Sequence, residues 1–147
     1  MTQSIEFASP WPPSVNTYWR MARGAFYITK KGKDYRQAMT EIVREQCLLQ
    51  DVRGQLKGRL SLRAELFPPD RRRRDIDNVL KAMLDAVQHS GLIDDDNQFD
   101  HLEVTRSDID APDGHVVLTI IELDPIRARA ALVREATQTI TVKELAV

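Results

Sequence analysis

The chain has 147 residues, 42% of them apolar, which is enough for one hydrophobic core and typical of a single domain. Its formal net charge of −1 does not by itself indicate a polyanionic partner. Cys47 is the only cysteine, which excludes an internal disulfide or a thiolate zinc site and fits a reducing cytoplasm. Apolar runs such as 116–121 are too short to cross a bilayer, so we expect no membrane segment.

The first 29 residues predict a strand, a loop and a hairpin. Residues 4–8 have strand-like alternation and end at the proline-rich segment 10–14, which predicts an ordered turn or loop. Residues 17–29 alternate aromatic and basic side chains around Gly24, which predicts a loose hairpin. Such interleaving suits stacking on nucleic-acid bases and contact with phosphate. For any single aromatic side chain, however, a place in the core is the favoured alternative.

The middle of the chain predicts two helices separated by a strand. Apolar residues recur at helical spacing over 31–49, and Thr29 is suited to cap that helix. Residues 59–67 alternate between apolar and polar, as in a strand with one buried face. A second amphipathic helix over 79–87 ends near Gly91, where a left-handed C-terminal cap is expected.

The C-terminal part predicts two more strands, over 99–106 and 115–123, that meet across a turn at 112–114. Strands and helices in this mixed order predict an α+β fold, with a mixed β-sheet and helices packed on one face. We expect one domain over residues 1–124. Residues 125–147 form a C-terminal extension to which the sequence assigns no role.

The two signs of charge are segregated along the chain. Residues 18–36 hold six bases and one acid, a local charge of +5. Four consecutive arginines follow at 71–74. Residues 85–124 hold eleven acids and the single base Arg106, a local charge of −10. One part of the chain is therefore suited to grip phosphate while another offers carboxylates, although a solvated surface explains such runs equally well.

Acidic and basic side chains concentrate at the start of the second predicted helix. Asp75 or Asp77 alone would be explained as a helix cap, but two aspartates behind four arginines exceed what capping needs. Lys81 follows Asp77 at the i+4 position, where an ordinary helical ion pair, worth about 0.3–0.5 kcal/mol, is the alternative to a catalytic role. Asp85 extends the same stripe by one more turn. The segment comprises Arg71, Arg72, Arg73, Arg74, Asp75, Ile76, Asp77, Asn78, Val79, Leu80 and Lys81.

A second acidic cluster, Asp94, Asp95 and Asp96, follows that helix. It is no calcium loop of the EF-hand type, because Phe99 and Thr105 stand where such a loop needs glycine and glutamate. A solvated turn remains an alternative. Magnesium, which binds a few carboxylates and keeps positions for water and substrate phosphate, fits three aspartates from two loops.

The segment from Arg74 to Lys81, Arg-Asp-Ile-Asp-Asn-Val-Leu-Lys, resembles the signature of the RusA family of Holliday-junction resolvases. The similarity runs from about Phe7 to Leu123. Asp94 departs from the family pattern, which commonly has an apolar residue there. Other landmarks in family order are Pro10-Trp11-Pro12-Pro13-Ser14, Leu84-Asp85-Ala86, Gly91 and Asp95-Asp96.

The resemblance implies a homodimeric, cytoplasmic endonuclease, encoded by a bacterium or a phage, that nicks four-way DNA junctions symmetrically with Mg²⁺, for which Mn²⁺ is a candidate substitute. It implies catalytic roles for Asp75, Asp77, Asp96 and Lys81, the three aspartates binding metal with Asp95 as the alternate ligand. We expect phosphate contacts from Arg71, Arg72, Arg73, Arg74, Arg20, Lys30, Lys31 and Lys33. A catalytically silent DNA-binding module and a broader flap or fork nuclease are the alternative functions. The remaining candidates, His89, His101 and His115, are expected to be bystanders, because imidazole is not a preferred magnesium ligand.

Overall fold

The computed structural model describes residues 2–124; the expected extension at 125–147 lies outside the described residues. Four strands form a mixed sheet in the order β1-β6-β4-β5. β6 pairs antiparallel with both β1 and β4, whereas β5 pairs parallel with β4. The expected α+β class with a mixed sheet is confirmed. The strands are β1 (Ser4–Pro10), β4 (Leu60–Phe67), β5 (Phe99–Arg106) and β6 (His115–Glu122).

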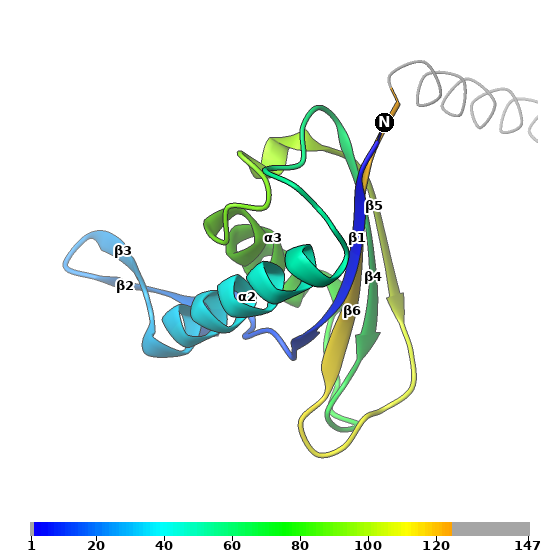
Figure 1. Cartoon of the computed structure of the whole chain (residues 1–147). Coiled ribbons are helices and arrows are strands. Elements are labelled where there is room, and N and C mark those ends of the chain that lie inside the picture. Colours follow the sequence, from blue (N-terminus) through cyan, green and yellow to red (C-terminus); the bar gives the residue numbers. More distant parts are fainter. Residues whose placement is uncertain (1, 125–147) are drawn as a thin grey trace, which may run out of the picture.

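The alternation of buried and exposed side chains along its strands identifies the core face of this sheet. In β4 the burial alternates so that Leu60, Leu62, Ala64 and Leu66 are buried. β6 buries Val116, Leu118 and Ile120 in the same way. β5, at the edge of the sheet, is exposed along most of its length. Figure 1 shows α2 (Lys30–Leu49) and α3 (Leu80–His89) together on one side of the sheet.

The expectation that the last two strands meet as a hairpin is wrong. β4 lies between β5 and β6, so these consecutive strands are not neighbours. The connecting segment is instead bonded to the end of β4: Ser107 donates to the carbonyl of Leu66 at 2.7 Å and Asp110 to that of Pro68 at 2.8 Å. β4 is buried on its core face and takes the central position, where both of its edges are paired.

Both expected helices are present, with ends within two residues of the predicted ones. The Thr29 side chain accepts a hydrogen bond from the Gly32 amide at 3.1 Å and caps α2, as expected. A 3-10 turn, η1 (Ile76–Val79), leads into α3. Gly91 follows α3 with φ +84, the left-handed conformation expected of it.

The predicted hairpin is formed by β2 (Trp19–Ala22) and β3 (Ala25–Ile28). Arg23 and Gly24 both have positive φ, of 52 and 76, as a two-residue type I′ turn requires. The hairpin projects away from the sheet at the start of α2 (Figure 1). A one-turn helix, α1 (Val15–Tyr18), which the sequence did not predict, lies between the expected loop at 10–14 and β2.

The core lies between the sheet and the two long helices. Tyr18, Met39, Leu56 and Met83 are fully buried there, together with the inward residues of the strands. Among the described helices none has the length and apolar character needed to span a membrane.

Candidate active site

Asp75 and Asp77 lie at the entrance to α3. Asp75 precedes η1 with extended backbone, and its carboxylate makes no capping hydrogen bond. Both residues are exposed, and within residues 2–124 neither carboxylate is held by a hydrogen bond or an ion pair. The capping alternative therefore does not account for them, and two oxygen donors remain free to bind a ligand.

Lys81 contacts the loop that follows α3. Its Nζ lies 3.4 Å from Oδ2 of Asp96, whose side chain is 29% exposed. The helical ion pair considered for Asp77 and Lys81 is not formed among the described residues. The structure thus joins the first acidic motif to the second through one lysine–carboxylate contact.

The backbone around Asp96 explains why Asp95 and Asp96 differ. The short helix η2 (Asp96–Gln98) is capped by Asp95, whose carboxylate accepts from the Asn97 amide at 2.9 Å. Gln98 completes the capping box by accepting from the Asp95 amide at 3.1 Å. Asp95 is therefore engaged in holding the loop, while Asp96 presents its carboxylate to Lys81.

Magnesium fits the donor set of these aspartates, since carboxylate oxygens are the hard ligands that the ion prefers. Within residues 2–124, no three Asp, Glu, His or Cys side chains are gathered closely enough to form a ready-made metal cluster. This arrangement suits an ion that completes its shell with water and substrate phosphate.

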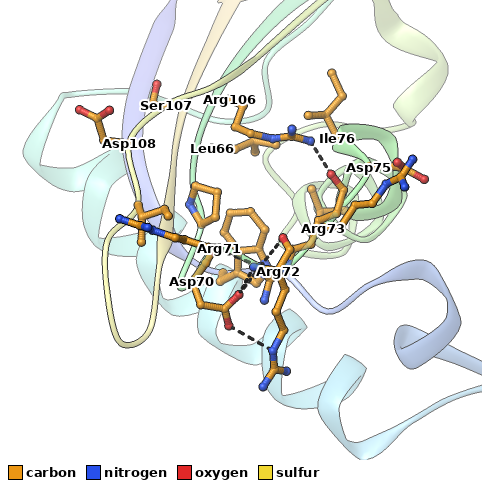
Figure 2. Close-up of a pocket in the computed structure, with 15 residues that line it drawn as sticks. Leu66, Asp70, Arg71, Arg72, Arg73, Asp75, Ile76, Arg106, Ser107 and Asp108 are labelled. Atoms are coloured by element: carbon orange, nitrogen blue, oxygen red, sulfur yellow. Dashed lines mark hydrogen bonds and ion pairs between the residues drawn. The ribbon is translucent and has the colours of Figure 1, made fainter.

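An open cavity of about 630 Å³ lies beside Asp75 (Figure 2). Arg74 lies across it and donates to Asp70 at 2.7 Å, and its guanidinium carbon is 5.8 Å from the centre of the Trp11 ring. The hydrogen bond from Arg74 lowers the pKa of Asp70 to about 2. Arg106, on β5, donates to the backbone carbonyl of Arg74. Arg74 is thus held by the fold, and it supports the loop that carries Asp75.

The other three arginines of the run, Arg71, Arg72 and Arg73, are exposed around the same cavity. A second open cavity, of about 890 Å³, is lined by Arg72, Arg73, Asp75, the proline-rich segment 10–14 and Lys31. Lys31 of α2 therefore shares the second cavity with Arg72 and Arg73, and Asp75 lines both cavities. Cations that surround a carboxylate in this way provide contacts for the phosphates that flank a cleavage point.

The remaining candidate side chains are spread over a wider surface. Lys30 forms an exposed ion pair with Asp34 at 3.3 Å. Lys33 lines a groove with Arg36, Arg44 and His89. Arg20 is exposed on the hairpin.

The other two histidines interact outside the acidic motifs. His101 contacts Ser61 at 2.9 Å, and His115 contacts Asp110 at 2.7 Å while stacking on Phe67. Their expected role as bystanders stays a prediction.

Asp85, expected to extend the stripe of Asp77 and Lys81, is part of a partly buried network instead. It accepts from Arg36 Nε and Nη2, each at 2.8 Å, and from the hydroxyl of Tyr18. Burial, followed by the hydrogen bond to Asp85, raises the pKa of Tyr18 well above its ordinary value. The network joins α1, α2 and α3, and it holds the helix that carries Lys81.

Sequence reasoning missed Arg106, Ser107 and Asp108, which line the first cavity opposite the arginine run (Figure 2). They follow β5, some thirty residues beyond the motif, and reach the site because β5 is parallel to β4. One signal was available: Arg106 is the only base between residues 85 and 124.

Free carboxylates, a lysine–carboxylate pair and a rim of arginines define a site suited to chemistry on phosphate esters. The family model of endodeoxyribonuclease RusA matches residues 10–121. The chain is 40% identical over 121 residues to the crossover junction endodeoxyribonuclease RusA of Enterobacteria phage HK97, covering 82% of this chain and 97% of that relative. The proteins of the same name from Shigella sonnei and Escherichia coli K12 are 39% and 37% identical over 114 residues, 78% of this chain and 91% of each relative. The chain belongs to the RusA family of endodeoxyribonucleases.

Proposed function

We propose that this protein is a crossover junction endodeoxyribonuclease that resolves Holliday junctions by paired, symmetric nicks during DNA recombination and repair, in the cytoplasm. Family membership and the names of relatives that are 37–40% identical support this function. The structural observation that best supports it is the contact between Lys81 and Asp96, which links the helix that follows Asp75 and Asp77 to the loop of the second acidic cluster.

Asp75, Asp77 and Asp96 are the proposed metal ligands, and the engagement of Asp95 as a cap supports Asp96 as the third member. When bound, a divalent ion such as Mg²⁺, or Mn²⁺ in its place, supplies an activated water and neutralises charge on the phosphate. Asp75 and Asp77 are exposed and unengaged within residues 2–124, so their binding to the ion breaks no interaction of the described fold, whereas Asp96 would share its carboxylate between the ion and Lys81.

Lys81 is proposed to stabilise the negative charge that develops on the phosphate being cut. A positioned cationic donor commonly contributes a few kcal/mol to such a transition state. Arg71, Arg72 and Arg73 then hold the neighbouring phosphates from the rim of the two cavities. Contacts of this kind position DNA without recognising its sequence, so affinity is expected to fall steeply with salt.

The domain over residues 1–124 is proposed to act as a homodimer, because a two-fold enzyme can cut two strands related by the symmetry of the junction. Sedimentation of the purified protein tests this part by itself. A monomer at the concentration that supports paired nicking would contradict it.

The function is tested by incubating a labelled four-way junction, a linear duplex and a flap with wild type, Asp77→Asn and Asp94→Asn, in Mg²⁺ or EDTA. We expect Mg²⁺-dependent paired nicks confined to the junction, lost in Asp77→Asn and kept in Asp94→Asn. Binding without cleavage by wild type would instead indicate a silent DNA-binding module. Equal cleavage of flaps and junctions would indicate a broader nuclease.

A further inference from the structure

The β2–β3 hairpin exposes apolar side chains that the proposed chemistry does not use. Phe26 is 77% exposed and Met21 is 66% exposed, and the two are direct cross-strand partners. Tyr27, 48% exposed, lies on the other face of the hairpin, where Arg20 is its cross-strand partner. The pair of Met21 and Phe26 stabilises the two strands by at most about 1 kcal/mol, yet it leaves a large apolar surface in water.

One face of the hairpin continues the core outward. Trp19 and Ile28 form the pair nearest the body, are partly buried and pack against the core. Two residues further along, on the same face, Met21 and Phe26 extend that apolar stripe into solvent. The inner half of the face is therefore anchored, while the outer half is mostly exposed.

Contacts at its base and the turn at its far end give the hairpin a defined conformation. The Thr29 amide donates to the Tyr18 carbonyl at 3.0 Å, which closes the base of the hairpin. The rings of Tyr18 and Trp19 meet edge to face at 4.2 Å. The type I′ turn at Arg23 and Gly24 matches the natural twist of two strands, so the far end is ordered as well.

The charges near the hairpin indicate the chemistry of the partner that it fits. Between Thr17 and Lys33 there are five bases, Arg20, Arg23, Lys30, Lys31 and Lys33, and no acid. Asp34, which pairs with Lys30, is the first acid after them. An exposed apolar ring in a segment with this excess of bases is complementary to a ligand that combines negative charge with flat apolar faces. Nucleic-acid bases exposed by a break in stacking have this chemistry.

The hairpin is also continuous with the proposed active site. The cavity that contains Asp75 and Arg73 is lined on its other side by Thr17 and Lys31, which flank the hairpin in sequence. A DNA strand held at Asp75 can therefore follow this cavity to the base of the hairpin.

We propose that the β2–β3 hairpin is a base-contacting wedge: Phe26, backed by Met21, stacks on a base that is unpaired or unstacked at the centre of a branched DNA. Arg20 and Arg23 contact the adjacent phosphates. The proposal rests on the proposed function for its DNA substrate, but base contact by the hairpin requires no metal and no cleavage.

The test uses the full chain in EDTA, so that no strand is cut, with a four-way junction carrying 2-aminopurine at the exchange point and a single-stranded oligonucleotide. Phe26→Ala is compared with Leu48→Ala as a matched control. Leu48 is 82% exposed near the far end of α2, roughly 27 Å along the helix from its start. Both substitutions remove an exposed apolar side chain, and thermal unfolding checks that neither changes the fold.

We expect wild type and Leu48→Ala to raise 2-aminopurine fluorescence as the base leaves its stack. Phe26→Ala should abolish that rise and weaken binding to both probes about tenfold or more, the loss of one base–aromatic stack. Phe26→Trp should retain binding.

Equal binding and fluorescence by Phe26→Ala and wild type would overturn the wedge. A change in the sedimentation of DNA-free Phe26→Ala would also overturn it, because that result would assign this face to a second copy of the chain. Wild type that binds and unstacks the junction without cutting it in Mg²⁺ would contradict the proposed function alone. Wild type that binds neither probe would contradict both proposals.

Discussion

Nζ of Lys81 lies 3.4 Å from Oδ2 of Asp96, although fifteen positions separate the two residues. Lys81 is on the first turn of α3 and Asp96 begins η2, beyond the end of that helix. The Asp96 amide also donates to Gln88 Oε1 at 3.2 Å, which ties the loop back to α3. The contact makes the helix and the following loop two walls of one candidate site.

Replacing Lys81 by alanine should lower junction cleavage by about 100-fold or more, because a cationic donor is lost beside the reacting phosphate. The free energy of unfolding should change by no more than about 1 kcal/mol, since the ion pair with Asp96 is largely exposed. Cleavage assays and urea unfolding measure the two effects separately. Lys57→Ala, at an exposed lysine outside both cavities, is the control, and an equal loss in that variant would refute a specific role for Lys81.

Asp85→Asn should reduce the free energy of unfolding by about 2–3 kcal/mol, because it weakens three hydrogen bonds from Arg36 and Tyr18 in a partly buried site. Urea unfolding measures this loss. Asp34→Asn is the matched control, since the ion pair of Asp34 with Lys30 is exposed and should contribute less than about 0.5 kcal/mol. Similar losses in both variants would mean that the network contributes no more to stability than an exposed ion pair does.

Gly114→Ala should destabilise the protein by more than about 2 kcal/mol, because the added Cβ would lie 2.7 Å from the backbone nitrogen of Pro69 and 2.8 Å from the carbonyl oxygen of Phe67. Gly58→Ala isolates the backbone contribution: its φ of +71 is close to the +68 of Gly114, but no atom lies within 4 Å of its Cβ. Gly58→Ala should lower the free energy of unfolding by only about 1–2 kcal/mol. Thermal unfolding of both variants checks the difference.

The carboxylate of Asp70 should titrate at about pH 2, and Arg74→Ala should return its pKa toward 3.8 because the principal hydrogen bond is lost. A lowered pKa means that the contribution of this pair to stability is present above pH 3.8 and disappears as the pH falls toward 2. Carboxyl NMR titration follows the group directly. An unshifted Asp70 in wild type would show that the contact with Arg74 is not maintained in solution.

Local pattern determined much of this protein. Apolar spacing predicted α2 and α3, alternation predicted β4, and Thr29 and Gly91 perform the expected capping. These features depend on neighbours within a few residues in the chain, which is the range over which sequence patterns operate. The resemblance of residues 74–81 to the RusA signature likewise identified the family that the comparisons establish.

Strand order and long-range partners were decided only by the tertiary structure. β4 lies between β5 and β6 and pairs with both. This order depends on the packing of the whole sheet, and the turn between β5 and β6 does not specify it. Asp85 and Lys81 were expected to share one stripe with Asp77, yet Asp85 bonds Arg36 and Lys81 bonds Asp96. A short charged side chain has several partners within reach along a helix, and the packing of other elements against that helix selects one of them.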